Sequence, residues 1–243
     1  MSSRAALWAV VPAAGRGARM GATRPKQYLP LAGQPVLQRS LDCLLALPGL
    51  QQVVVALAAD DDDWPTLAAA SDPRVRVARG GAERCDSVLA GLSVLAEVAS
   101  PDDWVLVHDA ARPCLAPQDL QRLVDSLVED AVGGLLALPV ADTVKRVDAD
   151  ARVVETVDRT DLWLAQTPQM FRLGMLSAAL RRALEQHQPV TDEASAMEWA
   201  GFQPKLVEGS PTNIKITRPG DLILAESFLR NEAASGEADR ACE

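Results

Sequence analysis

Short apolar stretches alternate with amphipathic stretches through the first half of this chain, and this alternation constrains the fold more than any other feature. An apolar stretch between turn residues predicts a buried strand, and apolar residues at helical spacing predict a helix packed on a sheet. Strands and helices that alternate in this order form a mostly parallel sheet with helices on both faces. We therefore expect one α/β domain over residues 1–230, with a doubly wound, Rossmann-like sheet.

The alternation predicts the positions of the individual elements. The expected strands are 7–12, 52–58, 75–78, 104–108 and 133–140, and the expected helices between them are 36–47, 60–70, 86–98 and 117–128. Further along the chain we expect helices at 173–186, 193–200 and 219–230, and strands at 205–207 and 213–216. Residues 231–243 are small, polar and charged, so we expect a flexible tail there.

Residues 141–159 interrupt this alternation. Two weakly alternating polar stretches, 143–147 and 152–157, flank an expected turn at 148–151, and this pattern predicts a β-hairpin arm that protrudes from the sheet. Because an isolated hairpin is only marginally stable in water, the arm should pack against something. A second copy of the chain is the simplest candidate, so we predict a homodimer through this arm.

Composition excludes several classes of function. The 243-residue chain has a formal net charge of -9, which argues against nucleic acid or an anionic membrane as a partner. No apolar run approaches the ~20 residues of a transmembrane helix, and the N-terminus does not resemble a secretory signal. The four cysteines are widely spaced and form no metal-binding pattern, which is typical of reduced thiols in a cytoplasmic protein.

A glycine-rich loop, residues 12–21, follows the first expected strand. Glycines and small residues let backbone N–H groups approach phosphate oxygens. The spacing fits neither the P-loop nor the dinucleotide fingerprint, so the loop alone could also be a plain strand-to-helix turn. Arg19 and Lys26 flank it, and no Asp or Glu occurs before Asp42. Two fixed cations beside a triphosphate would neutralise the charge that grows on its α-phosphate during displacement.

This loop, followed by Pro25-Lys26-Gln27-Tyr28, is similar to the signature of sugar-phosphate nucleotidyltransferases. Its Pro-Lys-Gln-Tyr form resembles the 2-C-methyl-D-erythritol 4-phosphate cytidylyltransferase family of the non-mevalonate isoprenoid pathway. The resemblance continues through blocks that begin at Gly80, His108, Asp142, Thr156, Gln166, Thr191 and Asn213. Each block is modest alone, but in this order, over residues 10–225, they are highly specific.

The resemblance implies a nucleotidyltransferase fold and transfer of CMP from CTP to 2-C-methyl-D-erythritol 4-phosphate, with release of pyrophosphate. It makes Arg19 and Lys26 the catalytic residues, and Arg84 a support for the loop that closes over the nucleotide. The implied contacts to CTP come from Ala13, Ala14, Gly15, Gly81, Ser87 and Asp109. Many relatives carry Asp where this chain has Ala82, so any contact there must come from the backbone.

Asp109 follows an expected buried strand, where its carboxylate could hold Mg²⁺ or pair with Arg112. The resemblance places Asp109 near the CTP phosphates and the metal. It also implies that the acceptor phosphate is bound by Arg112, Thr143, Arg159, Thr191 and Lys215, with Thr143 and Arg159 reaching the partner's active site from the arm.

The residues alone leave other interpretations open. Thr191 and the acidic residues after it are typical of a helix N-cap. Lys215 within an apolar strand indicates either a buried anionic partner or an edge strand, and His108 is expected to be a packing residue. A ribitol 5-phosphate cytidylyltransferase and a non-catalytic nucleotide-sensing module are the alternative functions. The expected reaction needs no general base, because the attacking phosphate oxygen is already ionised near pH 7.

Overall fold

The computed structural model describes residues 5–15 and 24–240, with side chains described as far as residue 231 and a seven-stranded sheet at the centre. The strand order is β11-β7-β10-β6-β1-β4-β5. Within this sheet β10 alone runs antiparallel to its neighbours, so the sheet is mostly parallel as expected. The strands are β1 (Leu7–Pro12), β4 (Leu50–Leu57), β5 (Val75–Arg79), β6 (Trp104–Val107), β7 (Gly133–Pro139), β10 (Trp163–Arg172) and β11 (Lys205–Glu208).

Helices cover both faces of the sheet because successive strand residues point to opposite sides. In β1, Ala9 and Val11 join the apolar cluster with α1 and α3, whereas Val10 joins the cluster with α2, α4 and α5. The doubly wound prediction is therefore confirmed. These helices are α1 (Val36–Leu45), α2 (Arg84–Leu95), α3 (Pro117–Leu127), α4 (Leu173–Glu185) and α5 (Glu193–Trp199).

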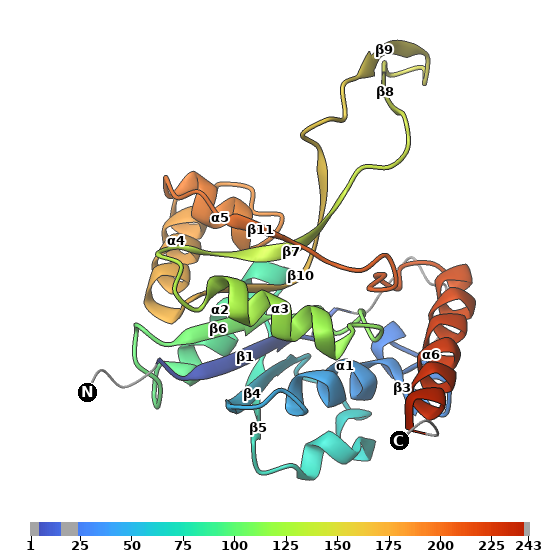
Figure 1. The fold of residues 1–243 in the computed structure, drawn as a ribbon. Coiled ribbons are helices and arrows are strands. Elements are labelled where there is room, and N and C mark those ends of the chain that lie inside the picture. Colours follow the sequence, from blue (N-terminus) through green and yellow to red (C-terminus); the bar gives the residue numbers. More distant parts are fainter. Residues whose placement is uncertain (1–4, 16–23, 241–243) are drawn as a thin grey trace.

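The last helix, α6 (Pro219–Arg240), stands beside the carboxyl ends of the parallel strands (Figure 1). Ala225 on α6 and Ile216 just before it are fully buried in a third apolar cluster with Val36 and Ala111. The Ile216 amide also donates to the Ala111 carbonyl at 2.8 Å. This packing holds the segment 213–217 against the rim of the sheet. No helix in the described part of the chain, α6 included, is both long and apolar enough to traverse a bilayer.

Two small two-stranded sheets accompany the main one. The strands β2 (Pro30–Leu31) and β3 (Gln34–Pro35) form a short turn before α1. The strands β8 (Val144–Val147) and β9 (Val153–Val157) pair antiparallel and form a hairpin within residues 141–159. Figure 1 shows this hairpin extending away from the rest of the molecule on two long connections.

Three sequence predictions about elements were wrong. The expected helix at 60–70 is replaced by two short 3-10 turns, η3 (Trp64–Thr66) and η4 (Ala68–Ser71). Pro65 removes a helical donor there, and Asp61 instead accepts hydrogen bonds from the Tyr28 hydroxyl and the Trp64 amide.

Residues 213–216 form no strand, and α6 continues ten residues beyond the expected end at residue 230, to Arg240. The added segment holds no proline and several good helix formers. The strand β10 was missed because its polar Gln-Thr-Pro-Gln block hides the strand pattern.

The crossing of α2 over β1 depends on Gly91. A Cβ atom added at Gly91 would lie 2.5 Å from Cγ1 of Val10, which is too close for any real contact. We expect Gly91→Val to lower the free energy of unfolding by about 1–3 kcal/mol, because overpacking forces the helix and sheet apart. Urea unfolding measures this. The matched control is Gly220→Val, where nothing lies within 4 Å; a loss of equal size there would contradict the packing argument.

Candidate active site

Two neighbouring cavities lie at the carboxyl ends of the parallel strands, as the sheet topology requires. The larger encloses about 400 Å³ and the smaller about 250 Å³. Arg84, Asp109 and Lys215 line both cavities. The larger cavity is otherwise lined by residues that follow β1, by the turn around Lys26 and by the loop before α2. The smaller is otherwise lined by Arg112, by residues of β10 and by Thr191 and Asp192.

The Lys-Gln-Tyr turn (η2, Lys26–Tyr28) is fixed by three consecutive side chains that each bind a different part of the fold. Lys26 Nζ donates to the Ile216 carbonyl at 2.8 Å, and Gln27 Nε2 donates to the Ala13 carbonyl at 2.8 Å. The Tyr28 hydroxyl, buried in the core, donates to Asp61 Oδ2 at 2.7 Å. The turn therefore holds the Lys26 ammonium at the wall of the larger cavity.

The loop before α2 closes against the loop that follows β1. A Cβ atom at Gly80 would lie 2.4 Å from Cβ of Ala14, so the two loops touch only because residue 80 is glycine. Ser87 Oγ accepts a hydrogen bond from the Gly81 amide at 3.1 Å and fixes the loop to the first turn of α2. Ala82 lines the cavity without a polar side chain, so a contact from this position must use its backbone.

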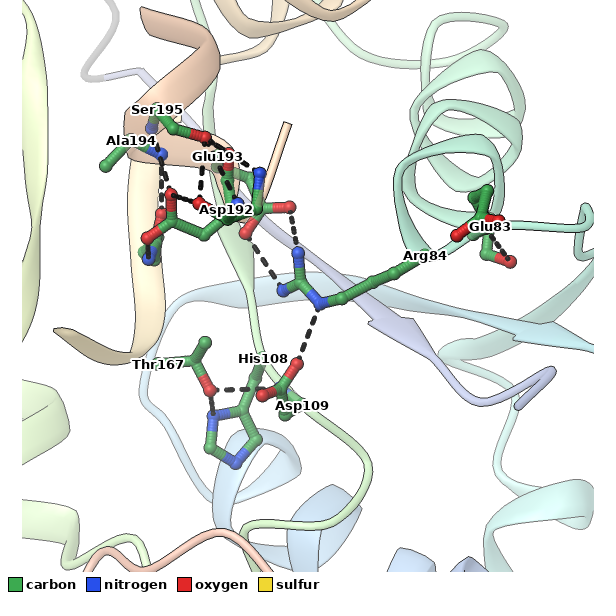
Figure 2. A network of polar contacts seen from close by, with 12 residues as sticks. Glu83, Arg84, His108, Asp109, Thr167, Asp192, Glu193, Ala194 and Ser195 are labelled. Atoms are coloured by element: carbon green, nitrogen blue, oxygen red, sulfur yellow. Dashed lines mark hydrogen bonds and ion pairs between the residues drawn. The ribbon is translucent and has the colours of Figure 1, made fainter. Parts of the chain in front are cut away.

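Asp109 is the electrostatic centre of both cavities and is only 6% exposed (Figure 2). Its Oδ1 accepts from Arg84 Nε at 2.9 Å, its Oδ2 pairs with Lys215 Nζ at 2.8 Å, and Arg112 Nε lies 3.7 Å from Oδ2. Burial alone would raise the pKa of Asp109, but the charges of Arg84 and Lys215 outweigh it and hold the pKa well below its usual range. Lys215 thus has the buried anionic partner that the sequence offered as one alternative, and the edge-strand alternative is wrong.

Arg84 also binds a second carboxylate. Its two Nη atoms donate to both oxygens of Glu193 at 2.7 and 3.0 Å, and Glu193 is fully buried at the start of α5. Figure 2 shows the guanidinium lying between Asp109 and Glu193. The neighbouring Asp192 caps α5 by accepting from the Ser195 amide at 3.0 Å. The cap pattern was visible in the sequence, but the pairing of Glu193 with Arg84 was not.

His108 is fully buried, as expected of a packing residue. Thr167 Oγ1 accepts from the Asp109 amide and lies 3.0 Å from His108 Nδ1, so its hydroxyl proton is directed at that nitrogen. His108 Nε2 lies 3.0 Å from the Arg112 carbonyl and donates to it. Both ring nitrogens of a neutral imidazole are therefore engaged, and His108 has no free nitrogen for proton transfer.

The structure brings together most of the residues that the sequence singled out. Those lining the larger cavity are Ala13, Ala14, Gly15, Lys26, Gly81, Ser87, Asp109 and Lys215. Those lining the smaller cavity are Asp109, Arg112, Thr191 and Lys215. Thr143 and Arg159 are exposed, one at each end of the arm, and line neither cavity. Arg19 lies outside the described residues.

Residues of β10 in the smaller cavity had no assigned role in the sequence interpretation. Gln166, Thr167 and Gln169 line it, and all three are buried. The Asn213 side chain donates to the Thr167 carbonyl at 2.8 Å, and Arg112 Nη1 donates to the Asn213 carbonyl at 2.6 Å. The sequence feature that could have identified these residues is the polar block that they form inside an otherwise apolar strand.

The donor set suits a divalent cation that arrives with phosphate. Glu83 and Asp109 are the carboxylates in the described lining of the larger cavity, and the described residues contain no cluster of three or more potential metal ligands. Mg²⁺ in phosphate-transfer sites is commonly held by one or two carboxylates together with substrate phosphates. Asp109 could supply such a carboxylate, and both of its oxygens contact cationic side chains in this structure.

The chain matches known proteins along most of its length. Residues 7–231 match the family model described as 2-C-methyl-D-erythritol 4-phosphate cytidylyltransferase. A curated relative of that name from Ectopseudomonas mendocina (strain ymp) is 63% identical over 217 residues, covering 89% of this chain and 92% of the relative.

Solved structures agree with this match. A crystal structure of 4-diphosphocytidyl-2C-methyl-D-erythritol synthase has a TM-score of 0.81 at 38% identity, over 94% of this chain and 100% of the other. The Francisella tularensis 2-C-methyl-D-erythritol 4-phosphate cytidylyltransferase has a TM-score of 0.80 at 36% identity, over 92% and 99% of the two chains.

The buried His108 makes stability depend on pH. Burial is the main cause that lowers the pKa of His108 from 6.5 to about 4. The unfolded chain therefore binds more protons than the folded chain between these values, and stability is lost as the pH falls below about 6.5. From pH 7 to pH 5, we expect the wild type to lose about 2 kcal/mol more unfolding free energy than a His108→Asn variant. Urea titrations of both proteins at the two pH values measure this, and parallel losses would refute it.

Proposed function

The chain belongs to the 2-C-methyl-D-erythritol 4-phosphate cytidylyltransferase family, and from this premise we propose that its larger cavity takes CTP and its smaller cavity takes the acceptor phosphate. The enzyme transfers CMP from CTP to 2-C-methyl-D-erythritol 4-phosphate, giving 4-diphosphocytidyl-2-C-methyl-D-erythritol and pyrophosphate in isoprenoid biosynthesis. The observation that carries the proposal is the wall that both cavities share, formed by Arg84, Asp109 and Lys215. Family membership favours neither ribitol 5-phosphate as acceptor nor a role in nucleotide sensing alone.

The proposed reaction is an in-line displacement. An oxygen of the acceptor phosphate attacks the α-phosphorus of CTP, the bond to the β-phosphate oxygen breaks, and pyrophosphate leaves. The attacking oxygen is already ionised and needs no general base, which agrees with His108, the residue before Asp109, having both ring nitrogens engaged. Catalysis then consists of positioning and charge neutralisation. Lys26, and Arg19 from the loop after β1, stabilise the charge that develops on the α-phosphate.

The nucleotide is held by the two touching loops. Ala13, Ala14, Gly15, Gly81 and Ser87 line the larger cavity, and their small side chains leave room for a ligand to approach the backbone. We assign Asp109 as the protein ligand of Mg²⁺, which would neutralise phosphate charge when bound with CTP. This assignment rests on the chemistry of the donor set and on the position of Asp109 in the wall between the cavities.

The acceptor phosphate is assigned to Arg112, Thr191 and Lys215 in the smaller cavity, with Thr143 and Arg159 added by the arm of a second subunit. Arg112 suits this task because a guanidinium can bind phosphate through two parallel hydrogen bonds. The support for a homodimer is the exposed apolar surface of the hairpin, where Val147, Val153 and Val154 are 50%, 62% and 63% exposed. Such valines on an isolated hairpin call for a covering surface.

We also propose a cytoplasmic enzyme that uses small molecules and its own second copy as partners. The formal net charge of -9 disfavours attraction to nucleic acid or an anionic membrane.

Lys26→Ala tests the catalytic assignment. Removing the ammonium should lower kcat/KM by a factor of about 10²–10³, roughly 3–4 kcal/mol of activation free energy. The lost hydrogen bond to the Ile216 carbonyl should lower the free energy of unfolding by only about 1 kcal/mol. Pyrophosphate release from CTP with 2-C-methyl-D-erythritol 4-phosphate measures it, and parallel assays with ribitol 5-phosphate should stay near background. Lys205→Ala, an exposed lysine on β11, is the matched control and should keep full activity. Normal turnover by the Lys26 variant would refute the role.

Mixing two inactive variants tests whether the arm acts in the partner's site. Lys26→Ala and Arg159→Ala should each be nearly inactive as homodimers. After unfolding and refolding together, half of the dimers are mixed and each mixed dimer has one intact site, so we expect about one quarter of wild-type activity. If the arm serves its own subunit, the mixture will show only the average of the two separate variants, and that outcome would overturn the exchange.

A further inference from the structure

The guanidinium of Arg84 joins the two sides of the candidate active site. Arg84 is the first residue of α2, directly after the loop that lines the larger cavity, and it also lines the smaller cavity. One edge of its guanidinium holds Asp109 and the other holds Glu193. Arg84 therefore connects the loop on the nucleotide side with the start of α5 on the acceptor side.

Glu193 supplies a rigid end to this connection. The amide of the next residue, Ala194, donates to Gln169 Oε1 at 2.8 Å, and Gln169 Nε2 donates to Asp192 Oδ2 at 2.9 Å. These bonds attach the start of α5 to β10, a central strand of the sheet. Because Glu193 is fully buried and grips both Nη atoms, Arg84 has little freedom to choose another rotamer.

The buried ion pair of Glu193 and Arg84 is not explained by a gain in folding stability. Burial raises the pKa of Glu193 and the nearby Arg84 charge only opposes this effect, so the ionised pair is held at a cost in desolvation. Replacing a buried ion pair by apolar groups is often neutral for stability. The geometry of the pair, a planar fork fixed between two substrate cavities, points to a role in the reaction.

We infer that Glu193 is a positioning residue that couples acceptor binding to nucleotide binding by holding Arg84 against Asp109. Residues 186–189 and Thr191, which precede α5, are exposed, so an acceptor that contacts Thr191 orders this segment and thereby restrains Glu193 and Arg84. Arg84 in turn orders the loop of residues 81–83, so the nucleotide binds a site already arranged for it. The coupling works equally in the other direction. This inference rests on the proposed assignment of the two cavities to CTP and acceptor.

The experiment measures the coupling itself. Calorimetric titration gives the affinity for the α,β-methylene analogue of CTP, whose Pα–C bond is not cleaved, with and without saturating 2-C-methyl-D-erythritol 4-phosphate. In the wild type the acceptor should tighten analogue binding by about fivefold or more. In Glu193→Gln this factor should fall to about one, and kcat should fall by about tenfold or more. A purely structural role would weaken both affinities and leave their ratio unchanged.

Two further variants separate coupling from general destabilisation. Asp130→Ala removes hydrogen bonds to the amides of Val132 and Gly133 at the start of β7. Asp130 lines neither cavity, so this variant should lower stability while keeping the wild-type factor. Arg84→Gln should abolish the factor as Glu193→Gln does, and the double variant should lose nothing more. Arg84→Gln also provides the test if Glu193→Gln does not fold.

The outcomes distinguish this inference from the proposed function. Two outcomes overturn the role of Glu193 and leave the cavity assignment intact. One is a wild-type enzyme that turns over both substrates but shows no coupling. The other is a Glu193→Gln or Arg84→Gln protein that keeps the full wild-type coupling factor. An acceptor that competes with the analogue in the wild type overturns the assignment of two separate cavities, and the inference with it.

Discussion

The site depends on one physical constraint: Asp109 is a charge buried at the end of β6, and a buried charge requires partners. Three cationic side chains from distant parts of the chain surround it, Arg84 from α2, Arg112 from the following loop and Lys215 from the segment before α6. In the described lining of the larger cavity three cations, Lys26, Arg84 and Lys215, stand against two carboxylates, Glu83 and Asp109, which leaves one formal positive charge to attract phosphate. The same ion pairs also hold the walls of both cavities together, so the pairs that neutralise Asp109 also determine the shape of the site.

The rest of the fold places these charges and keeps them in position. Apolar clusters on both faces of the sheet fix the parallel strands, and their carboxyl ends present the phosphate loop, the loop before α2 and Asp109 to one region. The third cluster anchors α6 and thereby the segment that carries Lys215 and the carbonyl acceptor of Lys26. The Lys-Gln-Tyr turn adds a second, independent attachment. A reaction that relies on positioning needs such rigidity, because misplacement of reacting groups by 1 Å costs about a hundredfold in rate.

The two cavities differ in the kind of residues that line them. The larger cavity, which we propose for the nucleotide, is lined largely by small residues whose backbones can approach a ligand closely. The smaller cavity, proposed for the acceptor, is lined by polar side chains of β10, Arg112 and Thr191. The wall that they share carries both the carboxylate and two of the cations. The hairpin stands apart from both cavities with apolar side chains exposed, so the chain as a single subunit presents Thr143 and Arg159 outward. A site completed by a second copy accounts for both features.

The sequence by itself determined the layered architecture, because apolar runs report local burial: the run at residues 7–12 predicted a buried strand, and residues 9–11 of β1 pack against helices on both faces. It also predicted several residues that line the larger cavity, since Ala13, Gly15, Lys26 and Ser87 lie in blocks next to strand ends. Only the tertiary structure decided which charges meet. Arg84 and Glu193 are separated by 109 positions, and Lys215 reaches Asp109 from a segment that is not the strand its pattern suggested. The acidic run before Trp64 likewise looked like a helix start and instead braces Tyr28. Local patterns report only short-range preferences, whereas ion pairs depend on how distant segments pack.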